Sequence, residues 1–162
     1  MEKNVLINEV LKPFLEQVKM GDMRTVMFPK MFDNEIAIRV GLGQGQASNV
    51  PFIAFLGKDQ EVQNGIYPVV AYYKNHDVLF LAYGVSVNNT PELKWDADDK
   101  KFIDEYFKDL DISLKFAEAK YCKERIYSMY KLKGIGAMDK EILNQLAEDI
   151  IKFVGEYKKR IG

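Results

Sequence analysis

The chain has 162 residues, of which 48% are hydrophobic and 29% charged, and its formal net charge is −1. This length suits a single domain with a proper core, and the composition excludes an intrinsically disordered chain. No apolar run approaches the about 18 residues that a membrane-spanning helix requires, and the polar N-terminus does not have the pattern of a secretory signal.

The first predicted element is a helix over residues 3–20, because apolar side chains recur there every four residues: Leu6, Val10, Phe14 and Val18. Pro13 should kink or split this helix, and Gly21 suits its end. After an irregular stretch, residues 35–42 alternate between apolar and polar side chains. This alternation predicts a half-buried strand.

Three further strands are predicted in the middle of the chain, over residues 52–56, 66–73 and 78–83. Asn64 and Gly65 form a turn signal before the second of these strands. The tight turn at residues 75–77 predicts that the last two strands form a hairpin.

The C-terminal half is predicted to hold a helix over residues 98–110, a fifth strand over 125–132 and a long terminal helix over 139–160. Residues 111–123 fit neither periodicity. Short connections favour antiparallel pairing. The predicted fold class is therefore α+β: one domain over residues 1–162, with a mixed, mostly antiparallel, curved sheet of four to five strands flanked by N-terminal, middle and C-terminal helices.

Charge is segregated along the chain. Residues 92–111 hold eight acidic and four basic side chains, whereas residues 112–133 hold six basic and two acidic ones. Two interpretations fit this pattern. Either each run forms a solvated face, or the basic run contacts DNA while the acidic helix faces away from it.

The sequence lacks the motifs of common enzymes. It has no P-loop, and its spaced glycines do not match the dinucleotide fingerprint. His76, the only histidine, is predicted to be a solvent-exposed turn residue, and Cys122, the only cysteine, an inert thiol in a reducing, cytoplasmic setting. The carboxylates of Asp96, Asp98 and Asp99 are better explained as a helix N-terminus than as a Mg²⁺ site. We therefore predict no catalytic residues, no metal site and no cofactor.

Two other features indicate binding. Gly41, Gly43 and Gly45 lie on alternate positions between two apolar runs, which suggests that something large approaches the backbone there. In the strand over 66–73, Tyr67 and Ala71 share one face, and both faces of this strand are apolar. From periodicity alone this pattern fits an ordinary aromatic core or a recess beside an aromatic wall.

Four motifs follow one another in the middle of the chain: Val-Pro-Phe-Ile-Ala-Phe-Leu-Gly at 50–57, Asn-Gly-Ile-Tyr-Pro-Val at 64–69, Tyr-Tyr-Lys at 72–74 and Leu-Ala-Tyr-Gly at 81–84. Together they resemble the N-terminal DNA-binding domain of the McrB family. Members of this family are the specificity and GTPase subunits of methyl-specific (type IV) restriction endonucleases. The resemblance implies a domain that binds duplex DNA and flips a modified base, such as 5-methylcytosine, into an aromatic pocket. It also implies a GTPase domain in the same parent chain, a McrC-type nuclease as partner, a cytoplasmic location, no membrane contact, and no catalysis by this domain alone.

The resemblance also assigns residues. The pocket would be formed by Phe52, Tyr67, Ala71, Tyr83 and Tyr121. Gln44, with Gly43 and Gly45, would form the loop that fills the gap in the duplex. The DNA backbone would be held by Gln46, Ser48, Asn49, Arg39, Lys58 and Lys74.

Phe52, Ala71 and Gln44 depart from the family pattern, in which larger or aromatic residues are expected. The smaller side chains of Phe52 and Ala71 suggest a base bulkier than 5-methylcytosine: 5-hydroxymethylcytosine, a glucosylated cytosine or N6-methyladenine. Two alternatives stay open. One is a nucleic-acid or protein binding module of the same fold without base flipping, and the other is a small enzyme that acts on nucleobases.

Overall fold

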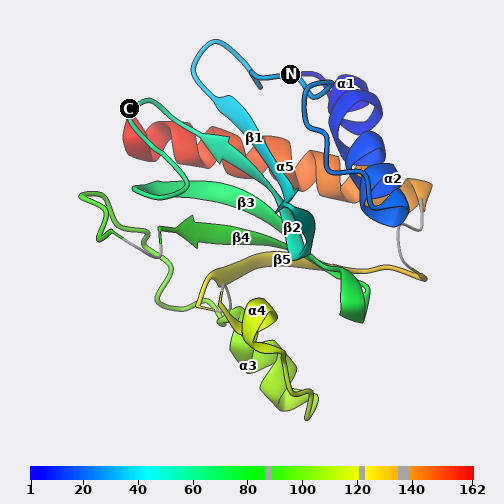
Figure 1. The fold of residues 1–162 in the computed structure, drawn as a ribbon. Helices are drawn as coiled ribbons and strands as arrows, with labels where there is room; N and C mark the ends of the chain where they lie inside the picture. The colour runs from blue at the N-terminus through cyan, green and yellow to red at the C-terminus, as the bar shows by residue number, and fades with distance from the viewer. Residues whose placement is uncertain (87–88, 121–122, 135–138) are drawn as a thin grey trace.

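The protein folds around one open antiparallel sheet of five strands in the order β1-β2-β3-β4-β5 (Figure 1). The computed structural model describes residues 1–86, 89–120, 123–134 and 139–162. The strands are β1 (Ala37–Gln44), β2 (Gln46–Leu56), β3 (Ile66–Tyr73), β4 (Val78–Val85) and β5 (Arg125–Lys131). The predicted α+β class is confirmed, and every strand pair is antiparallel. Within the described part of the chain, no helix has the length and apolar character needed to cross a membrane.

The N-terminal helix is not split at Pro13, because the chain is helical without a gap from Lys3 to Met20. It consists of α1 (Lys3–Leu6), a π-helical turn η1 (Ile7–Leu11) and α2 (Lys12–Met20). Proline has no N–H to donate to the preceding turn, and the wider π turn just before it accommodates the missing bond. Gly21, at a φ of 73°, ends α2 in the left-handed conformation.

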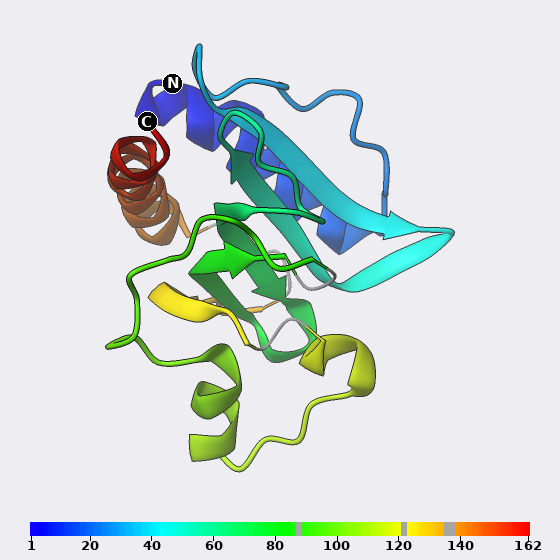
Figure 2. The same ribbon diagram turned by 90° about the vertical axis from the view of Figure 1, so that its left-hand side faces the viewer.

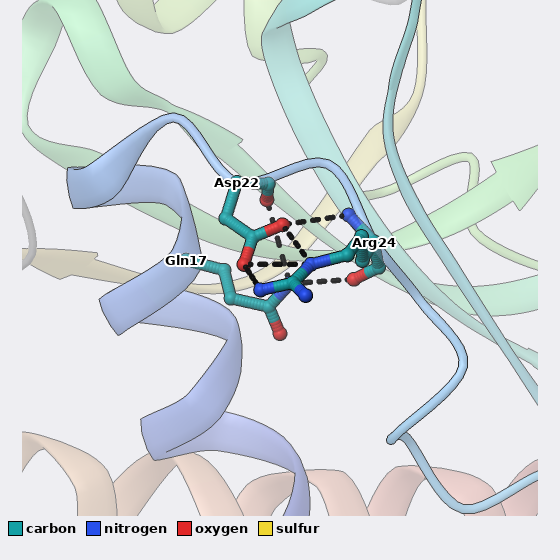
Figure 3. A network of polar contacts seen from close by, with 3 residues as sticks. All are labelled: Gln17, Asp22 and Arg24. Carbon is teal, nitrogen blue, oxygen red and sulfur yellow. Dashed lines mark hydrogen bonds and ion pairs between the residues drawn. The ribbon is translucent and has the colours of Figure 1, made fainter.

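The segment after α2 is tied back to that helix by a polar network (Figure 3). The guanidinium of Arg24 donates to both carboxylate oxygens of Asp22, from Nε to Oδ1 at 3.0 Å and from Nη2 to Oδ2 at 2.7 Å. The hydrogen bonds from Arg24 lower the pKa of Asp22 to about 2. The buried side chain of Gln17 donates to the carbonyls of Asp22 and Arg24. These bonds fix the irregular stretch over 22–34 as it leaves the helix.

The C-terminal helix α5 (Lys140–Ile161) covers one face of the sheet together with the N-terminal helices (Figures 1 and 2). Asp139 caps it by accepting from the N–H groups of Glu141 and Ile142. The buried hydroxyl of Tyr157 accepts from the N–H of Gly57 at 3.0 Å and donates to the carbonyl of Ile66 at 2.7 Å. One side chain therefore joins the end of α5 to the connection between β2 and β3.

The middle helix differs from its prediction. α3 spans only Ile103–Asp109. Residues 97–100 form a turn in which the N–H of Lys100 donates to the carbonyl of Ala97, and residues 101–102 pair with the start of β5. The N–H of Ile126 donates to the carbonyl of Lys101, and the N–H of Ile103 donates to the carbonyl of Glu124. Because this turn and the pairing stand where the first helical turn was predicted, Asp98 and Asp99 do not cap a helix. Asp98 lies 3.8 Å from the guanidinium of Arg125 instead, and Asp99 lies beside Lys100.

A short helix, α4 (Phe116–Ala119), occupies part of the stretch whose pattern was ambiguous. The fifth strand and the terminal helix are confirmed to within two residues at each end. Strand β2 is longer than expected, because its pairing with β1 continues past Phe52 to Gln46.

Candidate functional site

The glycine segment forms the tip of a β-hairpin. Gln44 and Gln46 are Cα partners at the ends of β1 and β2, and Gly45 alone turns the chain at a φ of 77°. Gly43 has a φ of 129°, and the register shifts beside it. Both positions require glycine. The hairpin projects away from α5, and its tip exposes Gln44 and Gln46 (Figure 2). The connection between β1 and β2 is therefore a single residue, Gly45, and residues 46–49 belong to β2.

Two other glycines lie directly against the aromatic rings of predicted pocket residues. A Cβ on Gly41 would lie 2.2 Å from Cε1 of Phe52, its cross-strand partner, and a Cβ on Gly84 would lie 2.6 Å from Cε2 of Tyr67. The large group that approaches the backbone at Gly41 is thus the chain's own aromatic ring. Each glycine leaves room for a ring to lie flat on the sheet.

Phe52, Tyr67 and Ala71 share one face of the sheet. Ala71 is the Cα partner of Phe52 in β2 and of Phe80 in β4, and Tyr67 is four residues along the same strand. Phe52 is half-buried, whereas Tyr67 and Ala71 are 4% and 2% exposed. The hydroxyl of Tyr67 donates to the carbonyl of Val62 at 3.1 Å.

Tyr83 does not join this group. It lies on the opposite face, where its ring packs against Phe153 of α5, Trp95 and Tyr127 with ring centres 4.8, 5.0 and 5.9 Å away. The alternation of side chains along β4 places it there, since its neighbour Gly84 pairs with Tyr67. Tyr121, the fifth residue assigned to the pocket, and Cys122 lie outside the described residues.

The residues assigned to the DNA backbone are not gathered on this face, because Ser48 and Lys74 line a small hollow beside the end of α2. Arg39 is exposed in β1, on the same side of the sheet as Phe52, and Lys58 is exposed just after β2. Lys74 follows β3 and is half-buried. Ser48 and Asn49 already have partners, because Oγ of Ser48 accepts from the N–H of Val50 and Oδ1 of Asn49 accepts from Asn75.

The helix α4 is fastened to the turn between β3 and β4 by a buried carboxylate. Glu118 accepts from the backbone N–H of Lys115 at 3.0 Å and from Nδ2 of Asn75 at 3.3 Å, and its Oε2 lies 2.9 Å from Nε2 of His76. The ring of His76 also lies 5.1 Å from that of Phe107. His76 is in the predicted turn, but it is not solvent-exposed, because α3 and α4 both pack against it.

This network places a hydrophobic side chain in solvent. Phe116, at the start of α4, is 91% exposed, and α4 lies on the same side of the molecule as the glycine hairpin (Figure 2). The sequence did not single out Phe116, because one apolar residue in an irregular stretch carries no periodicity.

Replacement of Glu118 with glutamine is expected to destabilise the domain at pH 7 by about 1–3 kcal/mol, the typical effect of weakening buried hydrogen bonds to a charged group. Burial would raise the pKa of Glu118, but the bonds from Lys115 and Asn75 and the charge of His76 outweigh it and hold that pKa below its usual value. The stabilisation is therefore present above the unfolded pKa and is lost as the pH falls through the folded one.

Urea unfolding from pH 7 down to pH 3 measures this effect, with the exposed Glu105→Gln in α3 as control. A Glu118→Gln variant as stable as Glu105→Gln at pH 7 would show that the network does not hold α4.

A cavity of about 550 Å³ lies at the edge of the sheet, between the end of β4, the segment over 90–97 and the start of β5. Three aromatic side chains line it: Tyr83, Trp95 and Phe102. Three lysines also line it: Lys94, Lys120 and Lys123. Glu124 also lines it, is 8% exposed, and has an Oε2 without a hydrogen-bond partner among the described residues. Burial raises the pKa of Glu124 to about 8. Sequence reasoning missed this site because its lining comes from residues with no shared motif.

Comparison with known proteins identifies a relative. No family model matches the chain. The chain is 39% identical over 106 residues to the type IV methyl-directed restriction enzyme EcoKMcrB subunit of Escherichia coli strain K12, which corresponds to 61% of this chain and 23% of that subunit. The chain thus spans about a quarter of the length of the relative that it matches. The identity confirms the resemblance that the four motifs indicated: over these residues the chain is similar to a McrB subunit.

Proposed function

We propose that this domain binds duplex DNA and recognises a modified base, which it flips out of the helix onto the face formed by Phe52, Tyr67 and Ala71. The observation that carries the proposal is the pair of aromatic rings seated on glycines on one face of the sheet, beside a projecting hairpin. The similarity to a methyl-directed restriction subunit supports it.

Base flipping needs a surface that replaces the stacking lost from the duplex, and aromatic rings provide one. Phe52 is the accessible member of the group, so an extruded base meets its ring first. Tyr67 and Ala71 are buried in the free domain, and the side chains that cover them must move before a base reaches them. Binding therefore includes a local rearrangement of this face.

The glycine hairpin would enter the duplex, with Gln44 in the gap left by the base. Its backbone N–H groups, Gln46, and the cations Arg39, Lys58 and Lys74 would hold phosphates. The helix α4, which carries the exposed Phe116, lies on the same side of the molecule as the hairpin (Figure 2). These contacts fix the register of the domain on DNA without reading sequence.

In this proposal, the chain is the recognition domain of a longer restriction subunit. A GTPase domain of the same parent and a McrC-type nuclease would supply motion and cleavage, in the cytoplasm. The domain itself would bind DNA and catalyse nothing.

Ala71 is expected to determine the size of the accepted base. It lies between Phe52 and Phe80 across two strand pairs, so a larger side chain would narrow the space between those rings. The Ala71→Leu variant should lose about 1–3 kcal/mol of binding to a bulky base such as glucosylated cytosine, and retain 5-methylcytosine binding. Equal selectivity in the variant and the parent domain would exclude a role of Ala71 in size selection.

Fluorescence polarisation at fixed salt tests the proposal as a whole. Matched duplexes would carry cytosine, 5-methylcytosine, 5-hydroxymethylcytosine, glucosylated cytosine or N6-methyladenine at one position. Binding that is at least about tenfold tighter for one modified duplex supports the proposal, since tenfold corresponds to about 1.4 kcal/mol. Equal and salt-sensitive binding to all five would identify a DNA-binding module without base recognition, and no binding would leave Phe52 and Tyr67 as core residues.

A further inference from the structure

The cavity at the sheet edge has the composition of a ligand site rather than of a packing defect. Its walls combine the aromatic rings of Tyr83, Trp95 and Phe102 with the hydroxyl residues Ser86 and Thr90. Packing defects in protein cores are apolar and small, whereas ligand sites are apolar clefts of about 300–1,000 Å³ with a few polar groups. At about 550 Å³, the cavity is large enough for a nucleotide.

Glu124 provides the polar group inside it. Its carboxyl is more than nine-tenths buried, and Oε2 has no partner in the described part of the chain. Its backbone carbonyl is held by the N–H of Ile103, so the residue is fixed in place. A buried carboxyl without a partner is unfavourable unless something else bonds to it.

Burial raises the pKa of Glu124 to about 8, so the carboxyl is mainly neutral at pH 7. A neutral carboxyl donates one hydrogen bond and accepts another. This pair complements the adjacent donor and acceptor on the pairing edge of a nucleobase. A carboxylate, by contrast, only accepts.

Lysine side chains line the same cavity. Lys94 comes from the segment before α3, and Lys120 and Lys123 come from the stretch between α4 and β5. Arg125 is already engaged, because its Nη1 donates to the carbonyls of Asp98 and Lys100 and its guanidinium lies 4.1 Å from the centre of the Phe102 ring. The exposed Lys94 and Lys123 therefore supply the positive charge of the site that can meet an anion.

We propose that this cavity binds a nucleotide, with the base edge on the carboxyl of Glu124 and the phosphate at Lys94 and Lys123. The proposal goes beyond the function above, because none of these residues belongs to the face of Phe52, Tyr67 and Ala71. The nucleotide is either free or part of a DNA strand held by the domain. Both sources present the same base and phosphate.

Trp95 makes the proposal directly testable. It is the only tryptophan of the chain, it lines the cavity, and its Nε1 donates to the carbonyl of Gly84 at 2.9 Å. Its fluorescence would be followed while CMP, AMP, GMP, UMP, ribose 5-phosphate or inorganic phosphate is added. We expect at least one nucleotide to change the fluorescence saturably, and at least about tenfold weaker binding of ribose 5-phosphate, which lacks the base.

Two variants of one residue separate the role of the carboxyl from a structural role. Glu124→Gln keeps a donor and an acceptor and should bind nucleotide within a few-fold of the parent domain, whereas Glu124→Leu keeps the bulk and should bind at least about tenfold more weakly. Glu105→Gln, on the exposed side of α3, is the control for charge. No saturable response to any nucleotide, or equal affinity in Glu124→Leu, overturns the proposal.

Duplex binding by the same variants identifies the source of the nucleotide. If Glu124→Leu loses both mononucleotide and modified-duplex binding, the site takes a nucleotide of the DNA strand. If it loses only mononucleotide binding, the ligand is free. If the domain binds modified duplex but no nucleotide in this cavity, the present proposal fails while the proposed function stands.

Discussion

Replacement of Glu124 with leucine is expected to stabilise the free domain, and to do so more strongly as the pH rises from about 4.5 to about 8. Glu124 is buried, its Oε2 has no partner in the described residues, and burial raises its pKa from the ordinary value of 4.5 to about 8. Leucine has a similar volume and nothing to desolvate. Each unit by which the folded pKa exceeds the unfolded one corresponds to about 1.4 kcal/mol.

The direction of this change in stability with pH follows from the number of protons that the folded and unfolded states bind. Below pH 4.5 the carboxyl is protonated in both states and the pH dependence vanishes. Between 4.5 and 8 the folded state keeps a proton that the unfolded state has lost, so stability falls as the pH rises, and the loss is complete above about 8. Urea unfolding at pH 5, 7 and 8.5 would show a growing difference between Glu124→Leu and the parent domain. The same difference at all three pH values would contradict the assignment of this titration to Glu124.

The second large effect on the stability of the domain is expected from substitution of Gly84. A Cβ there would lie 2.6 Å from the ring of Tyr67 and 2.7 Å from the backbone oxygen of Tyr67. The ring has little freedom to retreat, because its hydroxyl is bonded to the carbonyl of Val62, and the strand oxygen has none. Gly84→Ala should therefore destabilise the domain by about 1–3 kcal/mol, as overpacking of a core does.

Gly155 supplies the matched control for this substitution. It lies on the exposed side of α5, and a Cβ there would meet nothing within 4 Å. Gly155→Ala should stabilise the domain by about 0.5–1 kcal/mol, because alanine favours the helix. Opposite signs for the two variants in thermal unfolding are the expected result. A neutral or stabilising Gly84→Ala would show that the Tyr67 ring does not depend on this glycine.

The strands, the terminal helices and the hairpin turn could be predicted from the sequence because they depend on local periodicity. Alternation placed Tyr67 and Ala71 on one face, and the spacing of apolar residues identified α5. Gly21 predicted the end of the N-terminal helix for a stereochemical reason that holds in any fold, whereas the helix continues through Pro13 after a π-helical turn.

The structure differs from the sequence-based predictions where contacts between residues far apart in the sequence decide the local conformation. Residues 98–102 have a helical pattern, but a turn at 97–100 and the pairing of 101–102 with the start of β5 replace the helix. His76 looked like an exposed turn residue, yet Glu118, 42 residues later, bonds to it. The cavity around Glu124 is lined by residues from several separate segments, and only the folded structure brings them together.

The most direct test of the central claim is a fluorescence measurement on duplexes with 2-aminopurine beside the target base, using the parent domain and Gly41→Ala. The substitution places a Cβ where the Phe52 ring now lies, so the ring must leave its position. We predict that the parent domain raises the 2-aminopurine fluorescence on the modified duplex, and that Gly41→Ala binds DNA with a smaller rise. No rise with the parent domain on any modified duplex, despite binding, would contradict base flipping onto this face.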